Sequence, residues 1–497
     1  MKFSRLLRLS LQTDEVFTLV MIIASASLLV GCDYQSGIPN LALSEFTATG
    51  TGNLMYPQFD EEIRHYAIKC APTDVMSLSA TASGEQAYVW FDGHPPELKT
   101  TQVVLANPDP DQDIVVTVFS NNQFRQYTLH CLAEDFPEIQ VVHADPEVTP
   151  DLMLVAPRFR QNGQRISYLM VLDNNGVPRF RHKIEGSAVD FKRHTNGLYS
   201  YALRQANNDF SVPDYVIVIL DEDFNEISQL QTVGLTQTDG HDFIFTDEGN
   251  AIFISYNSTS RDMTAFGLAA DEIVGDSVIQ EVTPDGQVLF QWNSWDHIDL
   301  ADCQATGYPR FASDYGHLNS IDLTADGDLI ASFRGCGQIL KIDRPSGDVI
   351  WRMGGSMSDF QILGDSFNEF CGQHTALEIA SDRILMFDNG SYCLGDREEV
   401  FGQFSRIVEY RLDLSAGQAH FIRDHSLNGT YQDFTRSTGS VQLLANGNWL
   451  ISWGNGPDMS ITEVNPSSNE VFSMKILFDG SIAVTYRAFR ESSLPRN

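Results

Sequence analysis

Residues 319–333 read NSIDLTADGDLIASF. Two apolar runs flank an Asp-Gly-Asp turn, which predicts two antiparallel strands, because aspartate and glycine accept the backbone of tight turns. The same order of strand, turn and strand recurs at 243–255 (FIFTDEGNAIFIS), 377–387 (LEIASDRILMF) and 441–453 (VQLLANGNWLISW). Outer hairpins such as 339–351 (ILKIDRPSGDVIW) add two more strands to a unit.

Six such units fit between residues 150 and 490, counted from a first strand near Leu152. Radial repetition of four-stranded units is typical of a β-propeller, a closed fold that protects its sheet edges. The sequence therefore predicts an all-β protein whose main domain, residues 150–490, is a six-bladed β-propeller. The alternative is a long, irregular all-β protein.

The segment 46–135 lacks this repeat. Short alternating runs, such as AYVWF at 87–91 and DIVVTVF at 113–119, predict a small antiparallel β-sandwich. In MYPQFD (55–60) and QYTL (126–129) it resembles the cadherin-like β-sandwich modules of bacterial surface proteins. Such modules are spacers or supports, so we assign no chemistry to this domain.

The N-terminus predicts export. A basic start precedes the apolar residues 16–30, and LVGC at 29–32 resembles a lipobox. We expect a signal peptide over residues 1–31, a lipid on Cys32 and a tether over 32–45. The alternative, a transmembrane anchor, is disfavoured because the apolar run is shorter than the ~20 residues of a span. The prediction is a periplasm-facing lipoprotein, attached by its lipid to either the inner or the outer membrane.

The chain of 497 residues carries a formal net charge of −34. Such a charge repels nucleic acid and anionic lipid, so neither is expected as a partner. An anionic substrate would need a local cationic pocket.

Six cysteines follow Cys32, and export permits disulfides. Two strands share a Tyr-x-x-x-Cys pattern, two further cysteines flank a predicted hairpin, and two remain. These features favour the pairs Cys70–Cys131, Cys371–Cys393 and Cys303–Cys336, although the sequence alone does not establish the connectivity.

Three histidines begin the innermost strand of their units: His241, His317 and His374. We call them the column histidines. Innermost strands line the central channel of a propeller, so the three are expected at its mouth. Each taken alone could be a core or turn histidine, and the shared position favours a functional role.

Arg334 ends the second strand of the unit that carries His317. Its planar fork suits a sulfate or phosphate group. The alternative is a salt bridge at the rim.

Five short motifs carry a family resemblance: GHLNS (316–320), SFR (332–334), WRMGG (351–355), QH (373–374) and FDNG (387–390). In order and spacing they resemble bacterial aryl-sulfate sulfotransferases that need no nucleotide sulfate donor. The resemblance spans about residues 150–490. It implies a six-bladed propeller with an N-terminal β-domain, an aryl sulfate donor, a phenolic acceptor and no cofactor. No tyrosine could be assigned to the acceptor pocket.

The resemblance also assigns roles to residues. It implies that His374 carries a transient sulfuryl group, and that His241, His317, Asn319 and Arg334 bind that group. Neutral His374 would attack sulfur, and His241, which precedes Asp242, would protonate the leaving phenolate. Two half-reactions on one histidine imply ping-pong kinetics.

Three other functions remain open at this stage. The column histidines could bind zinc for hydrolysis, although Arg334 would repel the cation. The propeller could also be a non-catalytic binding platform. A quinone-dependent dehydrogenase ranks last, because no recurring tryptophan motif is present.

Overall fold

The computed structural model describes residues 41–50, 54–205, 213–309, 313–395, 397–456 and 458–492. The predicted signal peptide, the lipidation site Cys32 and most of the tether lie outside the described residues. Within the described ranges, no helix is long and apolar enough to cross a membrane.

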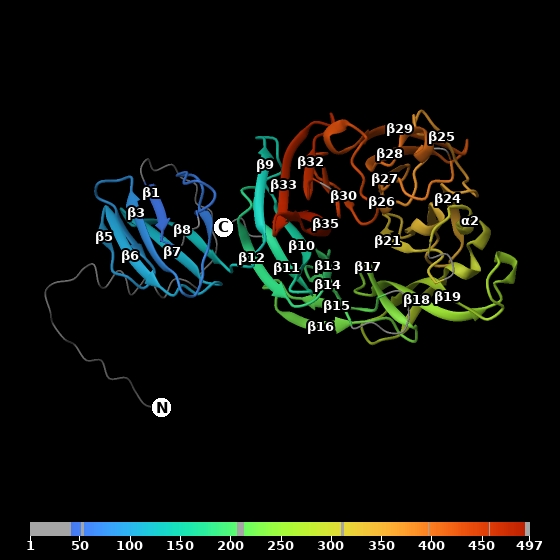
Figure 1. Cartoon of the computed structure of the whole chain (residues 1–497), viewed down its shortest axis with the longest axis horizontal. Coiled ribbons are helices and arrows are strands. Elements are labelled where there is room, and N and C mark those ends of the chain that lie inside the picture. Colours follow the sequence, from blue (N-terminus) through green and yellow to red (C-terminus); the bar gives the residue numbers. More distant parts are fainter. Residues whose placement is uncertain are drawn as a thin grey trace, which may run out of the picture.

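The N-terminal domain is a β-sandwich that lies beside a larger ring of sheets (Figure 1). Its first sheet contains β1 (Leu43–Thr49), β3 (Val75–Ala82) and β6 (Thr100–Ala106). Its second sheet contains β2 (His65–Lys69), β8 (Gln123–Leu132), β7 (Asp113–Ser120), β4 (Tyr88–Phe91) and β5 (Glu97–Leu98). Alternating buried positions of both sheets form one apolar core.

The strands β2 and β8 run parallel, which corrects the expectation of a wholly antiparallel sandwich. Their register pairs Ile68 with Cys131 and leaves Cys70 just beyond the strand end. Because the two strands run in the same direction, their matching Tyr-x-x-x-Cys patterns end side by side. The predicted disulfide Cys70–Cys131 is confirmed.

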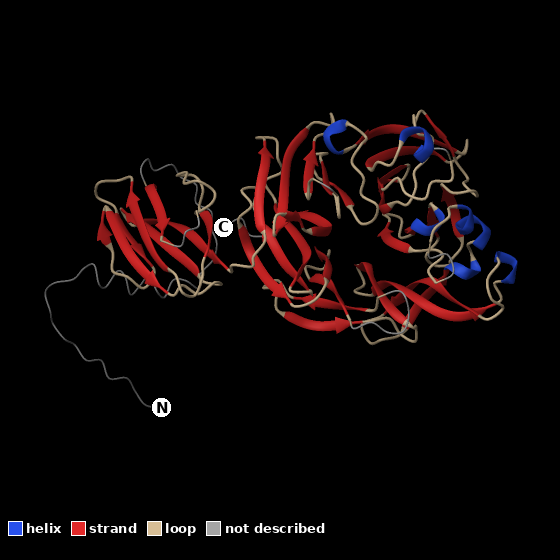
Figure 2. Ribbon diagram, viewed as in Figure 1, coloured by secondary structure: helices blue, strands red, loops and turns tan. Residues whose placement is uncertain are grey.

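The described part of the chain after this domain consists mainly of strands joined by loops, with a few short helices (Figure 2), and it confirms the predicted all-β propeller fold. The first sheet of the propeller contains β10 (Leu152–Gln161), β11 (Gln164–Leu172), β12 (Pro178–Ile184) and β35 (Val484–Glu491). The second contains β13 (Ala188–Arg193), β14 (Tyr199–Arg204), β15 (Tyr215–Leu220) and β16 (Glu226–Leu230). The third contains β17 (Gln237–Phe245), β18 (Ala251–Arg261), β19 (Glu272–Val282) and β20 (Val288–Asn293).

Three more sheets follow. The fourth sheet contains β21 (Leu318–Leu323), β22 (Leu329–Phe333), β23 (Gln338–Ile342) and β24 (Val349–Met353). The fifth contains β25 (Gln361–Leu363), β26 (His374–Ala380), β27 (Arg383–Asp388), β28 (Arg406–Asp413) and β29 (Gln418–His425). The sixth contains β30 (Ser440–Leu443), β31 (Trp449–Ser452), β32 (Ile461–Val464), β33 (Glu470–Phe478) and β34 (Ser481–Ile482).

The two ends of the propeller sequence close the ring. Strand β35, near the C-terminus, pairs with β10, so the first sheet combines three early strands with the last strand of the chain. Strand β9 (Glu138–Ala144), which lies between the two predicted domains, pairs with β33 and extends the last sheet. Both pairings join distant segments, and a unit-by-unit count along the sequence did not predict them.

The helices of the described ranges are short and lie in connections between strands. They are α2 (Leu300–Ala305), α3 (Arg397–Phe401) and the 3-10 turns η1 (Thr264–Phe266), η2 (Ser294–Asp296), η3 (Arg334–Cys336) and η4 (Leu427–Gly429). The predicted disulfide Cys303–Cys336 joins α2 to η3, and Cys371–Cys393 spans the β26–β27 hairpin, so all three predicted pairs are confirmed.

Candidate active site

A cavity of about 560 Å³ lies where the column histidines meet. Its wall includes His241, His317 and His374, together with Arg334. The structure thus brings together four of the five residues that the sequence singled out. They come from three successive sheets, on β17, at the start of β21, at the end of β22 and on β26.

A β-bulge lies beside each of the three column histidines and orients its side chain. The strand register shifts between Thr238 and Phe243, between Leu318 and Ser320, and between His374 and Ala376. Each shift is a bulge beside a column histidine, and bulges re-aim side chains. His317 itself has a φ of 46°, in the left-handed region that β-strands avoid. The three positions therefore share a distorted backbone as well as a residue type.

His374 is a buried, neutral imidazole. Its Nδ1 lies 2.6 Å from Oδ1 of Asn389, whose Nδ2 donates to the carbonyl oxygens of Thr435 and Thr438 at 2.7 and 2.9 Å. Those two donations fix Oδ1 as the acceptor, so Nδ1 carries the proton. The backbone N–H of Thr438 donates to Nε2 at 3.1 Å, so Nε2 carries the lone pair.

Two effects keep His374 unprotonated. Burial, reinforced by the nearby positive charge of Arg334, holds the pKa of His374 well below its usual range. The hydrogen bond to Asn389 opposes this shift only in part. A neutral imidazole with a lone pair on Nε2 has the protonation state that a nucleophile needs.

The other two column histidines have carboxylate partners. Nδ1 of His317 lies 2.5 Å from Oδ2 of Asp314, and Nδ1 of His241 lies 2.6 Å from Oδ1 of Asp239. The two rings meet edge to face, with centroids 5.0 Å apart. Burial lowers the pKa of His317, and the charge of Asp314 opposes that shift. A carboxylate behind Nδ1 orients the ring and stabilises a proton on it, which suits proton transfer at Nε2.

The expected partnership of His241 with Asp242 is wrong. Asp242 points away and forms ion pairs with Lys192 and Arg487, at 2.5 and 2.9 Å. Successive residues of a strand face opposite sides, so the neighbour in sequence is not the neighbour in space. The partner of His241 is Asp239, two residues earlier.

Arg334 is buried and directed at the cavity. Its Nη2 donates to the carbonyl oxygen of Arg436 at 2.8 Å, and its guanidinium lies over the rings of Tyr308 and Tyr392. Its Nε is buried and has no hydrogen-bond partner in the part of the chain that the structure describes. A buried donor without a partner is costly, which favours an anionic ligand at this place.

Asn319 does not reach the cavity. It is the extra residue of the bulge between Leu318 and Ser320, fully buried, and its Nδ2 donates to the carbonyl oxygen of Gln373 at 2.7 Å. The bulge turns its side chain toward the neighbouring sheet. Asn319 therefore positions the backbone just before His374, and the expectation that it binds the transferred group is not supported by its placement.

Sequence reasoning missed the aromatic and basic part of the wall. Tyr308, Tyr392 and Tyr486 line the cavity, as does Arg436. Tyr392 has a φ of 62° and precedes Cys393, and Tyr486 comes from the closing strand β35. In the sequence, these residues stand out only because they lie near a predicted disulfide or near the chain end. Neither position indicates which way a side chain points.

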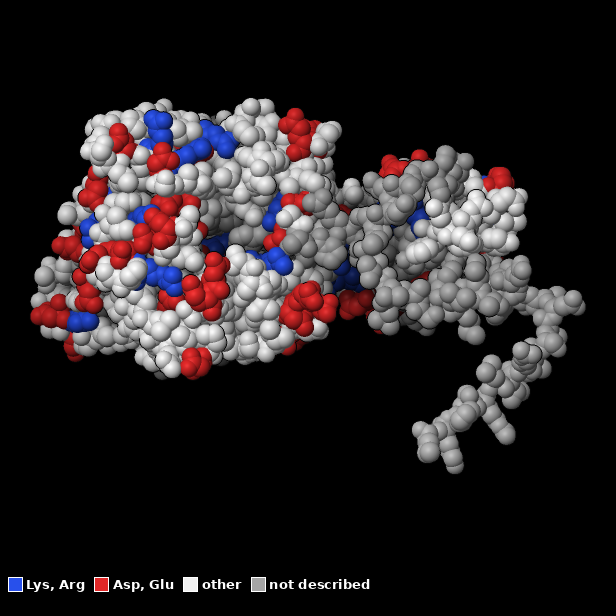
Figure 3. All heavy atoms as spheres, turned by 180° about the vertical axis from the view of Figure 1, so that it is seen from behind, with Lys and Arg blue, Asp and Glu red and all other residues white. Residues whose placement is uncertain are grey.

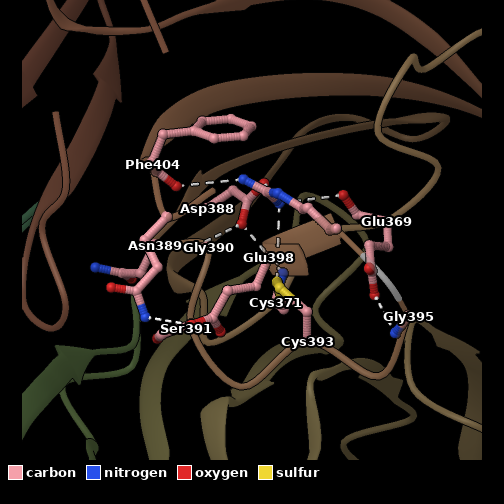
Figure 4. The surroundings of a disulfide bond; sticks show 12 residues. Glu369, Cys371, Asp388, Asn389, Gly390, Ser391, Cys393, Gly395, Glu398 and Phe404 are labelled. Carbon is pink, nitrogen blue, oxygen red and sulfur yellow. Dashed lines mark hydrogen bonds and ion pairs between the residues drawn. A yellow bond between two sulfur atoms is a disulfide. The ribbon is translucent and has the colours of Figure 1, made fainter. Parts of the chain in front are cut away.

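The disulfide Cys371–Cys393 lies close to the turn that carries Asn389, the hydrogen-bond partner of His374 (Figure 4). Asp388 accepts the backbone N–H of Cys371 and pairs with Arg397 at 2.5 Å, and Asn389 follows it directly. Gly390 has a φ of 68°, and a Cβ there would lie 2.0 Å from the carbonyl oxygen of Phe404. This tight turn therefore fixes where Asn389 presents its amide to His374.

The column histidines do not form a convergent set of metal ligands. Among the described residues, only Glu369, Cys371 and Cys393 bring three ligand atoms within 4.8 Å, and both cysteines are in a disulfide. The histidine Nδ1 atoms already face side-chain partners. Zinc hydrolysis thus finds no support in this geometry.

Solved structures share a low level of similarity with the chain. A protein of unknown function from Bacteroides caccae is 12% identical with a TM-score of 0.42, over 68% of this chain and 98% of that chain. The periplasmic gluconolactonase of Pseudomonas aeruginosa is 13% identical with a TM-score of 0.38, over 69% and 99%. An inactive virginiamycin B lyase from Staphylococcus aureus is 10% identical with a TM-score of 0.36, over 70% and 91%.

A search of curated proteins finds no match. The family model described as arylsulfotransferase (ASST) matches residues 215–476, a range that contains all three column histidines and Arg334. This range is more than half of the 497 residues. The chain belongs to the arylsulfotransferase family.

Proposed function

We propose that the protein moves a sulfuryl group from a phenolic sulfate ester to a phenol, with His374 as the covalent carrier. The observation that carries this proposal is the presence, in one cavity, of a neutral His374 and of Arg334. His374 has its lone pair on Nε2, and the buried Nε of Arg334 has no hydrogen-bond partner among the described residues. Sulfuryl transfer resembles phosphoryl transfer, in which catalysis is mainly positioning and stabilisation of charge on the peripheral oxygens.

In the first half-reaction, Nε2 of His374 forms a bond to sulfur while the bond from sulfur to the phenolic oxygen breaks. Nε2 must first exchange its hydrogen bond with the N–H of Thr438 for the sulfur atom. The released N–H of Thr438 and the Nε of Arg334 can then donate to sulfuryl oxygens. The proton on Nδ1 stays in place, and Oδ1 of Asn389 stabilises the positive charge that develops on the ring.

The leaving phenolate takes a proton from Nε2 of His241, whose Nδ1–H faces Asp239. In the second half-reaction, His241 removes the proton of the acceptor phenol, whose oxygen attacks sulfur and releases His374. His317 donates from Nδ1 to Asp314, so its Nε2 can donate to a sulfuryl oxygen only when the ring is protonated. Tyrosine rings of the wall suit an aromatic substrate.

The proposal is tested with a fluorogenic aryl sulfate, with and without an added phenol. Transfer predicts that the rate of donor cleavage rises with phenol concentration and that double-reciprocal plots are parallel. A cleavage rate that is indifferent to phenol would indicate hydrolysis, and no cleavage of any aryl sulfate would leave the binding platform as the better function.

We also propose that a lipid on Cys32 holds the protein at a membrane surface that faces the periplasm. Replacing Cys32 with Ser should release the protein from membranes. A variant that still sediments with membranes indicates a spanning anchor instead.

A further inference from the structure

A second cavity, of about 610 Å³, adjoins the candidate active site. It lies at β10, at the ends of β11 and β14, and at residues 478–484. Arg158 and Arg204 line both cavities, so the two share part of one wall. The two cavities are therefore neighbours, with Arg158 and Arg204 between them or along both.

Arginines gather in this second cavity: Arg158, Arg160, Arg165 and Arg204. Arg160 and Arg165 are direct register partners across the antiparallel pair β10–β11. Like charges in such a position destabilise a sheet. The pKa of Arg165 is lowered by burial and by the positive charges of Arg204 and Arg160, which expresses the same repulsion.

Across the described ranges, no ion pair involves Arg158, Arg160 or Arg165, although Asp479 lines the same cavity. Another register pair of arginines, Arg383 and Arg411, differs in this respect, because Glu409 binds Arg383.

Three arginines of one cavity without ion pairs to described carboxylates are unusual in so acidic a protein, which has 66 aspartates and glutamates against 32 lysines and arginines. Figure 3 shows acidic side chains spread over the outer propeller surface and basic ones near a central hollow.

We propose that this second cavity binds a second anionic group of the substrate, a carboxylate or sulfate carried at a distance from the reacting phenolic oxygen. The inference rests on the proposed function and deepens it, because it defines the substrate class as aromatic molecules with an extra negative charge. Arginine forks bind carboxylate and sulfate oxygens with paired, charge-assisted hydrogen bonds. The overall charge of the protein repels such molecules, so a local cationic site is needed to hold them.

The test uses phenolic acceptors that bear a carboxylate at the end of alkyl chains of increasing length, each matched by its neutral methyl ester. A sulfate-terminated series distinguishes the two anions. The parent protein should show a higher kcat/KM for the acid than for its ester at one chain length. In the double variant Arg160→Gln, Arg165→Gln, this acid-to-ester ratio should fall about fivefold to tenfold.

The matched control is Arg125→Gln, Arg411→Gln, which removes the same charge elsewhere. It should leave the acid-to-ester ratio at the parent value. An equal fall in both double variants would indicate general electrostatics and overturn the subsite, as would an unchanged ratio in the first.

Calorimetric binding of the same acids and esters separates the two proposals. The subsite is supported if the parent binds the acid more tightly than its ester and the variant Arg160→Gln, Arg165→Gln does not. If the parent shows this preference but transfers no sulfuryl group, the proposed function is refuted and the subsite stands. Transfer by the parent with no acid preference at any chain length would do the reverse.

Discussion

The surroundings of His374 and of the other two column histidines differ in one chemical respect. Behind Nδ1 of His374 stands the amide of Asn389, whereas carboxylates stand behind His241 and His317. An amide oxygen orients the ring without adding a charge, so the ring stays neutral. A carboxylate favours the protonated ring. The same residue type at equivalent places thus has a neutral hydrogen-bond partner in one blade and a carboxylate partner in the other two.

The largest expected effect comes from removing His374, the proposed nucleophile. His374→Asn should lower kcat for transfer by about 10⁴-fold or more, because the variant lacks the imidazole that is proposed to carry the sulfuryl group. His241→Asn should cost about 10²–10³-fold, and more for donors whose phenols are poor leaving groups. Steady-state rates across a series of aryl sulfates measure both. Equal losses in the two variants would remove the distinction between carrier and proton donor.

Arg334→Lys keeps the charge but removes the planar fork and the buried Nε. We expect kcat to fall by about 10²-fold, because a lysine cannot replace both the donation to the carbonyl oxygen of Arg436 and the donation to the sulfuryl group. The reverse charge-conserving control, Lys475→Arg on β33, should have no effect. A fully active Arg334→Lys variant would assign Arg334 to the structure of the rim.

Exchanging the partner of His374 tests the comparison itself. Asn389→Asp should give His374 a carboxylate partner and raise its pKa, so that a larger fraction of Nε2 is protonated at acidic pH. Activity at pH 6 should fall about tenfold to 100-fold and recover as the pH rises, whereas the parent, with its lowered pKa, should hold a neutral His374 throughout this range. The pH–rate profile measures the shift. Asn389→Ser is the neutral control, and a loss that does not depend on pH in either variant would show that only geometry matters.

A smaller effect is expected from the disulfide behind Asn389. Cys371→Ser with Cys393→Ser should lower kcat several-fold by loosening the turn that carries Tyr392 and Asn389. Cys70→Ser with Cys131→Ser, in the sandwich, should leave kcat unchanged and affect unfolding of the N-terminal domain. Measurements of kcat and of the thermal unfolding temperature in both double variants test this difference. Identical kinetic losses in the two would argue against a positioning role.

Much of the fold and part of the site could be predicted from sequence. The repeated strand–turn–strand order indicated the propeller, and the shared position of His241, His317 and His374 indicated its cavity. These features are periodic, so a local pattern carries them. The disulfides were also predictable, because Cys70 and Cys131 end strands that share a pattern and Cys371 and Cys393 flank a hairpin.

The rest depends on bulges and on contacts between distant segments. The bulge at Asn319 turns its side chain away from the cavity, and the one in β17 gives His241 the partner Asp239. Thr438, which donates to His374, lies 64 positions later in the chain, and Tyr486 arrives on the closing strand. A single-residue shift reverses the face of a side chain, and sequence alone does not locate such shifts.

The most direct test of the covalent carrier uses donor without acceptor. Incubation with an aryl sulfate carrying labelled sulfur should leave one label on the protein, which is lost in acid and maps to the peptide that contains His374. His374→Asn should take up no label, and His241→Asn should take it up slowly. Label on His317 would retain the mechanism and overturn the assignment, whereas absence of any label together with sequential kinetics would contradict the covalent mechanism.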